Sequence, residues 1–343
     1  MNKWLNQMHF GDCLETLRKM PAGLVDACVT SPPYFAMRDY RCKGQIGLET
    51  SPEEFVSKLV EVFSQVQRVL KKDGTLWIVM GDTYAQSGGA GKRQGGLSQR
   101  KNRSNLAEQS KVHTMRPPSG MKVKDLMGIP WRLAFALQGF AVIPSATVAQ
   151  WISWLGQAVE AQDWELVEMV HERMKAQLWL HALQEKGWYL RNDIIWNKSN
   201  AAPESVDDRC TRSHEYMFML SRSKRYYFDA DAIKEPVSRS DWQTESSGEQ
   251  SAMRQKRTVW SVNTEPYRGA HFAAYPTKLI EPCIMASTRP GEVVLDPFMG
   301  SGTTGEVAQN LGRQWVGCEI NPAYAPLQKS RHKQLGLMLE IAG

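Results

Sequence analysis

The sequence predicts an α/β protein with a mostly parallel sheet and helices on both faces of that sheet. Strand-like and helix-like runs alternate through the first part of the chain, and the run from Thr75 to Met80 reads as a continuous apolar strand. Such strands are typical of parallel sheets that helices cover on both sides. Near the C-terminus, the strand-like run Val293 to Leu295 leads into a glycine turn and a helix-like run. This is the arrangement in which α/β proteins hold a cofactor.

Local patterns predict each element of the N-terminal part. We expect strands over 7–10, 25–30 and 75–80 and a helix over 13–19. A second helix opens at Ser51, which suits the N-cap, with Pro52 in the first turn and Glu54 completing a capping box. Apolar residues recur at helical spacing as far as Leu70, and Asp73-Gly74 is expected to end that helix.

Further along the chain the same patterns return. We expect a helix over 124–138, strands over 188–196, 216–220 and 226–228, a helix over 303–311 and a strand over 315–318. The region 139–183 reads as an insertion of two amphipathic helices, with Asp163 as the N-cap between them. It carries a net charge of −3 and four tryptophans, so it is a poor phosphate binder. We expect its tryptophans to pack against the main domain or a partner.

Positive charge is concentrated in one segment. The chain has a formal net charge of +6, and the stretch from Lys92 to Lys124 holds nine Lys or Arg and one acidic residue. Residues 86–120 are rich in Gly, Ser, Gln and Asn and lack a core-forming face, which predicts a long loop. One-signed charge of this kind favours phosphate contacts, for which the candidates are Lys92, Arg93, Arg100, Lys101 and Arg103. The alternative is a solvated loop without a role.

Composition also excludes some classes of protein. No apolar run approaches the roughly 20 residues of a membrane helix, and Met1 to Trp4 does not resemble the start of a secretory signal. We therefore expect a soluble, cytoplasmic protein. The six cysteines are scattered without a CxxC pair, which favours free buried thiols and predicts no metal site.

The glycine turn is the first motif that indicates chemistry. In the run from Asp296 to Thr304, Gly300 and Gly302 let the backbone approach a ligand closely before the helix opens at Thr303. Neither GxGxxG nor GxxxxGK[ST] is present, which disfavours nicotinamide and nucleoside-triphosphate enzymes. Glu319 ends the next strand, where a carboxylate can accept hydrogen bonds from ribose hydroxyls.

The second motif is Ser31-Pro32-Pro33-Tyr34, a rigid turn with an aromatic ring that follows the strand over 25–30. Taken together, the two motifs resemble those of the DNA amino-methyltransferases that use S-adenosylmethionine. The catalytic motif comes first and the cofactor motif last, as in the permuted β group of that family. The resemblance implies a Rossmann-like fold with circularly permuted motif order, a helical insertion and DNA-recognition loops.

The resemblance also implies roles for individual residues. Glu319 would bind the ribose, Gly300 and Gly302 would line the methionine moiety, and the carboxylate of Asp12 would meet the adenine end. The run from His271 to Leu279 matches another cofactor motif. The full expected cofactor set is Asp12, His271, Phe272, Pro276, Asp296, Pro297, Phe298, Gly300, Ser301, Gly302, Thr303 and Glu319.

The Ser31 turn is expected to hold the target base. An exocyclic amine is a poor nucleophile because its lone pair is delocalised, and acceptors at the Ser31 hydroxyl and Pro32 carbonyl restore its electron density. Pro33 helps to fix that carbonyl, and Tyr34 offers its ring face to a base extruded from the duplex. Family members with Ser at the first motif position mostly modify N4 of cytosine, so we favour N4-cytosine, with N6-adenine as the alternative. A non-catalytic DNA-binding protein on the same fold is disfavoured because both motifs are intact.

The expected partner is double-stranded DNA, while a homodimer and a cognate restriction endonuclease stay open. Further candidate DNA contacts are Arg209, Arg212, Arg222, Lys224 and Arg225, with a solvated charge cluster as the alternative for the last three. The expected domains are a catalytic half (1–85), the basic loop (86–123), a continuation with target-recognition contacts (124–138 and 184–235), the helical insertion (139–183), a flexible loop (236–258) and a cofactor-binding half (259–343).

Overall fold

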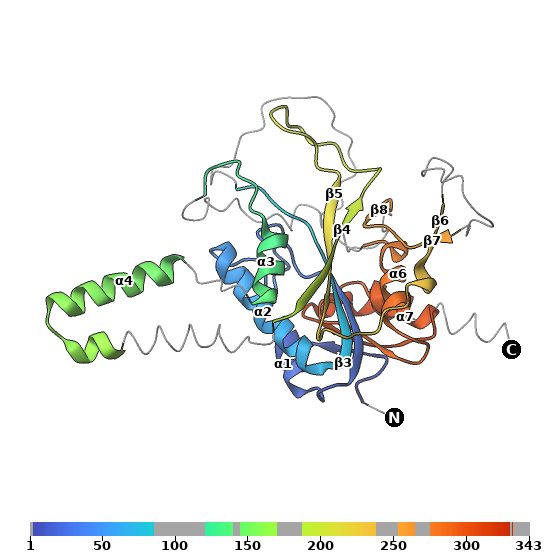
Figure 1. The fold of residues 1–343 in the computed structure, drawn as a ribbon, viewed down its shortest axis with the longest axis horizontal. Helices are drawn as coiled ribbons and strands as arrows, with labels where there is room; N and C mark the ends of the chain where they lie inside the picture. The colour runs from blue at the N-terminus through green and yellow to red at the C-terminus, as the bar shows by residue number, and fades with distance from the viewer. Residues whose placement is uncertain are drawn as a thin grey trace, which may run out of the picture. The chain divides into compact units, whose positions relative to one another are not determined.

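The computed structural model describes residues 3–85, 121–139, 145–169, 187–237, 253–264, 275–329 and 331. The chain forms two compact units (Figure 1). The first, here called the sheet unit, comprises Met1–Pro32, Val66–Val79 and Arg191–Gly343, and the second unit comprises Pro33–Gln65 and Met80–Leu190. The basic loop and the residues His271 and Phe272 lie outside the described residues.

An eight-stranded sheet that belongs almost wholly to the sheet unit has the order β1-β10-β9-β2-β3-β5-β4-β8. Its strands are β1 (Gln7–Phe10), β2 (Val25–Thr30), β3 (Leu70–Met80), β4 (Tyr189–Asn197), β5 (His214–Ser221), β8 (Val259–Ser261), β9 (Val293–Asp296) and β10 (Gln314–Glu319). The pairs β1–β10, β10–β9, β9–β2, β2–β3 and β4–β8 are parallel. This confirms the predicted fold class.

The strand order reverses between β9 and β2. From β2 the chain proceeds to β3 on one side, whereas from β9 it proceeds through helix α7 (Thr303–Asn310) to β10 on the other side. In open α/β sheets, ligands bind outside the carboxyl ends of the strands at such a reversal. We call that side of β1, β10, β9 and β2 the carboxyl edge, and the side where these strands begin the amino edge.

Helices α6 (Thr277–Ser287) and α7 bury the apolar face of this sheet. Their side chains pack in one cluster with residues from β2, β3, β4, β5, β8 and β9, including Val29, Trp77, Met217, Leu279 and Val294. Each fully buried Leu or Val contributes roughly 1.5–3 kcal/mol. The sequence patterns predicted neither α6 nor β8.

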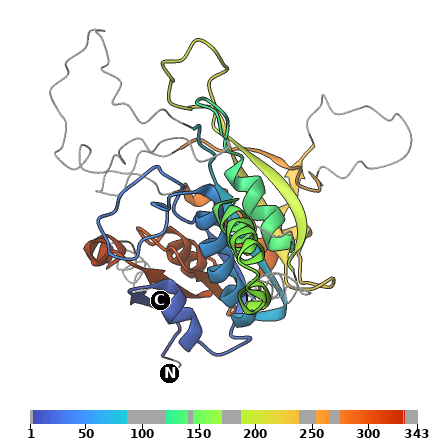
Figure 2. The same ribbon diagram turned by 90° about the vertical axis from the view of Figure 1, so that its left-hand side faces the viewer.

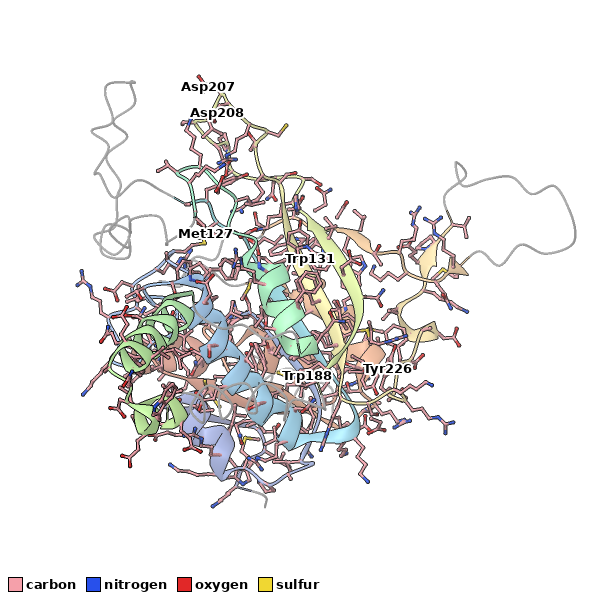
Figure 3. All side chains as sticks on the ribbon, turned by 60° about the vertical axis from the view of Figure 1, so that its left-hand side comes forward. Met127, Trp131, Trp188, Asp207, Asp208 and Tyr226 are labelled. Carbon is pink, nitrogen blue, oxygen red and sulfur yellow. The ribbon has the colours of Figure 1, made fainter. Side chains whose placement is uncertain are left out.

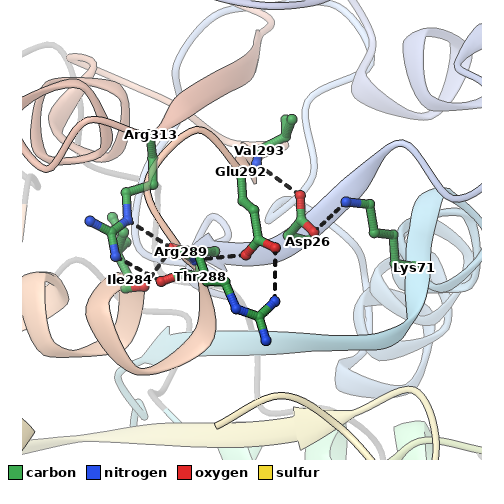
Figure 4. Close-up of polar contacts among 8 residues, drawn as sticks. All are labelled: Asp26, Lys71, Ile284, Thr288, Arg289, Glu292, Val293 and Arg313. Atoms are coloured by element: carbon green, nitrogen blue, oxygen red, sulfur yellow. Dashed lines mark hydrogen bonds and ion pairs between the residues drawn. The ribbon is translucent and has the colours of Figure 1, made fainter. Parts of the chain in front are cut away.

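The amino edge is held by polar contacts (Figure 4). The carboxylate of Asp26, near the start of β2, accepts a hydrogen bond of 2.9 Å from the backbone N–H of Val293, the first residue of β9. The same carboxylate pairs with Lys71 Nζ at 2.6 Å. Two strands that meet only through the fold of the whole chain are thereby joined where they begin.

Helix α1 (Cys13–Lys19) is confirmed, with Asp12 as its N-cap. Helix α2 (Pro52–Val69) also begins as predicted, since Ser51 Oγ accepts the N–H of Glu54 at 3.2 Å. The capping box itself is altered, because the Glu54 carboxylate accepts hydrogen bonds from the N–H and hydroxyl of Thr50.

Three sequence expectations about element boundaries are wrong. Asp73-Gly74 lies inside β3, because the register with β2 shifts between Val25 and Ala27 and the strand continues through this irregularity. A β-carbon on Gly74 would lie 2.8 Å from the carbonyl oxygen of Asp26, so the close approach of two backbones explains the glycine. Residues 226–228 form no strand, and Tyr227 instead donates its N–H to the carbonyl of Asp73.

The third correction concerns the second unit, where helix α3 (Ile129–Gln138) begins five residues later than position 124. The Asp82 carboxylate accepts the N–H groups of Gly128 and Ile129, each at 3.0 Å. These are N–H groups of the kind that a helix start leaves without a partner. A carboxylate far away in the sequence therefore decides where α3 begins.

The insertion forms part of the second unit. Helix α4 (Ser145–Glu160) and the helical residues 164–169 make a hairpin, seen from two directions in Figures 1 and 2. Asp163 is the predicted N-cap, because its carboxylate accepts the N–H of Leu166 at 3.0 Å. The two ends of the insertion meet, since the N–H of Trp188 donates to the carbonyl of Leu137 at 2.8 Å.

Within the described ranges, no helix combines the length and apolar character that crossing a bilayer requires. The same residues contain no group of His, Cys, Asp and Glu side chains that could hold a metal ion.

Candidate active site

The carboxyl edge brings together most of the site residues predicted from sequence. Asp12 follows β1, Glu319 ends β10, Asp296 ends β9 and Ser31 follows β2. Because β1, β10, β9 and β2 are adjacent and parallel, their ends lie side by side in that order. Four segments that are far apart in the sequence thus form one row.

Asp296 is the buried centre of this edge. Its Oδ1 accepts the hydroxyl of Thr30 at 2.6 Å and the N–H of Phe298 at 3.0 Å. Its Oδ2 accepts the hydroxyls of Tyr275 at 3.1 Å and Thr304 at 2.5 Å. Burial raises the pKa of the Asp296 carboxyl, and these hydrogen bonds oppose that rise. The protein's own donors surround this carboxylate, so its role at the site is to hold the turn that follows it.

The glycine turn after β9 has the backbone that its sequence predicted. Gly300 and Gly302 adopt left-handed conformations with φ of 53° and 92°, which cost glycine little and strain other residues. Gly302 is the N-cap residue of α7 and has no side chain with which to cap it. The backbone N–H groups of this helix start therefore point toward the carboxyl edge without a side-chain acceptor from the N-cap.

Glu319 fastens the turn to β10. Its carboxylate accepts the N–H of Gly300 and the N–H of Asn321, each at 2.8 Å. Burial raises the pKa of Glu319 to about 7, although these N–H donors oppose the shift. Each carboxylate oxygen has two lone pairs, so one hydrogen bond per oxygen leaves acceptor capacity for a ligand diol.

The turn also has a buried polar atom that awaits a partner. The hydroxyl of Ser301 is buried and makes no hydrogen bond to any described residue. Buried polar groups are rarely left unsatisfied. A ligand with polar atoms fits this turn better than an apolar one.

The remaining predicted cofactor residues have mixed placements. Asp12 accepts the N–H of Leu14 at 2.7 Å, so its carboxylate also caps α1, and the N–H of Gly11 bonds the carbonyl of Glu319 at 2.9 Å. Thr303 accepts a hydrogen bond of 3.1 Å from Arg331. Pro276 precedes α6 as its N-cap residue, and Pro297 is buried next to Asp296.

The Ser31 turn is ordered by backbone contacts. Ser31 is half-buried and Pro32 buried at the end of β2 in the sheet unit. In the second unit, the backbone of Gly47 closely approaches Tyr34, since a β-carbon on Gly47 would lie 3.2 Å from the Tyr34 carbonyl oxygen. The carbonyl of Gly47 accepts the N–H of Ala36 at 2.9 Å.

The predicted DNA contacts separate into two groups. Arg209 and Arg212 lie on residues 198–213, which connect β4 to β5, and Arg209 bonds Glu204 at 2.5 Å. That hydrogen bond lowers the pKa of Glu204. Figure 3 shows Asp207 and Asp208 at the tip of the same segment.

Arg222, Lys224 and Arg225 follow β5, which ends where β3 begins. Arg222 donates to the carbonyl of Leu70 and Ser223 to that of Lys72, both at the start of β3. The structure therefore places these three basic residues at the amino edge, away from Ser31, and does not bring them together with Arg209 and Arg212.

Sequence reasoning gave no separate role to Thr30, Tyr275 or Thr304, although all three reach Asp296. The signal was weak, because a single hydroxyl beside a known motif has no periodicity or spacing of its own. Only the paired strands show that these residues converge.

Comparison with known proteins agrees with this geometry. Residues 25–330 match the family model of the N6/N4 DNA methylases. The chain is 45% identical over 323 residues to the Type II methyltransferase M.Cfr9I of Citrobacter freundii, covering 94% of this chain and 85% of that protein. It is 42% identical over 323 residues to M.SmaI of Serratia marcescens, with coverage of 94% and 88%.

Solved structures share the fold. The cytosine-N4-specific PvuII DNA methyltransferase matches with a TM-score of 0.58 and 17% identity over 95% of this chain and 85% of that one. A DNA modification methylase of Thermus thermophilus, solved with S-adenosyl-L-methionine and titled as putative, matches with a TM-score of 0.51 and 22% identity, covering 95% and 92%. The family match over most of the chain, the identity to Type II methyltransferases and the row of motifs at the carboxyl edge show that this chain belongs to the N6/N4 DNA methylase family.

Proposed function

We propose that this protein is a site-specific DNA methyltransferase that transfers a methyl group from S-adenosylmethionine to N4 of cytosine in double-stranded DNA. One observation carries the proposal: the Ser31 turn follows β2 and the glycine turn follows β9, on the two strands that flank the reversal of strand order. An acceptor-binding turn and a cofactor-binding turn therefore stand next to each other at the carboxyl edge. We place the protein in the cytoplasm, together with its DNA.

The residues of the carboxyl edge fit S-adenosylmethionine. The left-handed backbone at Gly300 and Gly302 allows a ligand to approach closely, and the Ser301 hydroxyl is buried without a partner among the described residues. Glu319 has acceptor capacity for a ribose diol, and Asp12 ends the neighbouring strand on the outer side. The bound cofactor supplies a methyl group already activated on a sulfonium.

The remaining task of the protein is to present the amine. The Ser31 hydroxyl oxygen and the Pro32 carbonyl accept hydrogen bonds from the exocyclic amine and so keep its lone pair available for attack. Tyr34 stacks on the extruded base. No covalent intermediate between enzyme and base is needed, so catalysis depends on alignment of the amine with the methyl group and sulfur.

The preference for cytosine N4 rests on Ser31. Serine is a weaker acceptor than a carboxylate, and family members with Ser at this position mostly modify cytosine. The shared fold with a cytosine-N4-specific enzyme is consistent with this choice. For DNA contacts we propose the basic loop through Lys92, Arg93, Arg100, Lys101 and Arg103, together with Arg209 and Arg212 on the segment between β4 and β5.

The test is mass spectrometry of nucleosides from DNA incubated with the protein and methyl-labelled S-adenosylmethionine. We expect labelled N4-methylcytosine and none in reactions with Ser31→Ala. Labelled N6-methyladenine would replace the proposed base while leaving the methyltransferase assignment intact. Cofactor binding without any methylated nucleoside, on DNA that contains all sequences of six base pairs, would overturn the proposed function.

A further inference from the structure

Methyl transfer at the carboxyl edge requires that two separate turns keep a fixed relative position. The backbone pairing of β2 and β9 covers Ala27 with Val294 and Cys28 with Leu295. Beyond these pairs, the two chains continue into different turns. Thr30 is the last residue of β2 and the direct neighbour of Ser31. Its hydroxyl donates to Asp296 Oδ1 at 2.6 Å, across 266 positions of sequence.

The other donors to this carboxylate come from the cofactor side. They are the N–H of Phe298 within the glycine turn, the hydroxyl of Thr304 in α7 and the hydroxyl of Tyr275 before α6. Thr30 is thus the residue of β2, among the described donors, whose side chain reaches Asp296. The Thr304 hydroxyl also lies 3.5 Å from the carbonyl of Val29, at the limit of a hydrogen bond.

The link is well suited to hold a position. Thr30 and Asp296 are both buried, so water does not compete for their hydrogen bond. A hydrogen bond from a neutral donor to a buried charged acceptor is shorter and stronger than one between neutral groups. β-branched Thr30 also has few rotamers, which fixes the direction of its hydroxyl.

We propose that Thr30 is a positioning residue for methyl transfer, which sets the place of the Ser31 turn relative to the cofactor turn through Asp296. This inference rests on the proposed function. Displacement of a reacting group by about 1 Å can cost about 100-fold in rate. Loss of the Thr30 hydroxyl leaves Asp296 three donors and leaves every cofactor-side contact in place, so the rate of transfer falls while cofactor binding persists.

The test compares Thr30→Val, which keeps the shape and removes the hydroxyl, with Thr30→Ser, which keeps the hydroxyl. Thr75→Val is the matched control, because Thr75 is also buried in the sheet and accepts a hydrogen bond of 3.2 Å from Trp77 Nε1. Single-turnover rates are measured at saturating S-adenosylmethionine and DNA, cofactor Kd by calorimetry, and stability by urea unfolding.

We expect Thr30→Val to slow the single-turnover rate by about 10- to 100-fold and to change the cofactor Kd by less than about threefold. Thr30→Ser is expected to restore the rate to within about threefold of the wild type. Thr75→Val lowers stability without slowing transfer. The separation of rate from stability is what a merely structural threonine would not produce.

A Thr30→Val protein that transfers methyl as fast as Thr75→Val would overturn the inference. Equal slowing in Thr30→Ser and Thr30→Val would do so as well, because the hydroxyl would then be irrelevant. If Thr30→Val does not fold, Thr30→Ala removes the same hydroxyl with less bulk and enters the same comparison. Failure of the wild type itself to methylate DNA would instead count against the proposed function.

Discussion

Strands β2 and β9 are joined at both of their ends by an aspartate, and the two joints use different chemistry. At the amino edge, Asp26 combines a backbone N–H of Val293 with the charged amine of Lys71. At the carboxyl edge, Asp296 combines hydroxyls and an N–H, with no cationic donor among the residues that the structure describes. The charged joint lies where only folding is at stake, and the joint of neutral donors lies where the motifs meet.

The difference has a physical reason. A lysine beside the cofactor turn would repel a sulfonium, whereas hydroxyls satisfy a buried carboxylate without adding positive charge. Four donors also fix the carboxylate from several directions. We therefore expect changes at the carboxyl edge to affect ligand binding and rate, and changes at the amino edge to affect stability alone.

The largest effect is expected for Gly302→Val at the carboxyl edge. Valine at a φ of 92° is strained and places a branched side chain in the turn that meets the cofactor, so S-adenosylmethionine affinity should fall by at least about 100-fold. Gly312→Val is the matched control, because Gly312 has a φ of 70° in the turn before β10, at the amino edge. Calorimetry should show near-normal cofactor binding for the control. Near-normal binding in a folded Gly302→Val protein would remove the cofactor-turn assignment.

The next effect is on base holding. Tyr34→Ala should lower the rate of methyl transfer by about 10- to 100-fold, the range expected when a base loses an aromatic stacking partner. Cofactor binding should persist, because Tyr34 belongs to the acceptor turn. Tyr34→Phe keeps the ring and should stay within about threefold of the wild type. Loss of S-adenosylmethionine binding in Tyr34→Ala would show that this tyrosine serves the cofactor instead.

A pH dependence should mark Glu319. Its pKa of about 7 in the folded protein lies above the ordinary value of 4.5, so the protonated form is favoured by folding. As pH falls below 7, this group gains a proton, and cofactor affinity should drop by up to about tenfold per pH unit because an acceptor for the ribose is lost.

The same proton has the opposite effect on the empty protein. Ionisation of a buried acid costs free energy, so the contribution of Glu319 to stability falls as pH rises from about 4.5 to about 7. Calorimetry and urea unfolding of the wild type against Glu319→Gln isolate both effects. An identical pH dependence of affinity in the two proteins would exclude Glu319 from the ribose site.

At the amino edge, Asp26→Asn should act on stability only. The amide can still accept the N–H of Val293, but the ion pair with Lys71 is lost, and Lys71 is partly exposed to water. We expect urea unfolding to show a loss of about 1–2 kcal/mol, with methyl transfer within about twofold of the wild type. A change in rate as large as that of Thr30→Val would mean that the two joints do not differ in function.

The smallest effect is expected from removal of the insertion, which belongs to neither edge. Deletion of Gly139 to Leu183, with Gln138 joined to Gln184, leaves a short link where Leu137 and Trp188 already share a hydrogen bond. Cofactor Kd should stay within about twofold, since a shorter loop changes closure entropy by little. A deletion protein that binds S-adenosylmethionine and methylates no DNA would assign the insertion to DNA recognition.

The sequence predicted features that depend on local pattern. The strands around Val25, Thr75 and Val293 and the glycine turn follow from apolar runs and from the conformational needs of glycine. These elements form the carboxyl edge, so most of the candidate site could be foreseen residue by residue.

What the sequence could not predict depends on distant partners. The bulge at Gly74 arises from the backbone of Asp26, and the start of α3 is set by Asp82, 46 positions before Gly128. The contact between Thr30 and Asp296 spans 266 positions and has no signature in either segment. The placement of Arg222 at the amino edge likewise follows from the course of β5 rather than from its charge.

The order of strands also governs when the protein becomes active during its synthesis. β1, from the start of the chain, pairs only with β10 among the described strands, and Asn6 bonds the N–H of Trp315 across 309 positions. Contacts of such long range form late in folding. A nascent chain on the ribosome therefore carries its acceptor turn for most of translation without a cofactor turn to match it, and an interrupted chain that lacks β10 leaves no partly active methyltransferase in the cell.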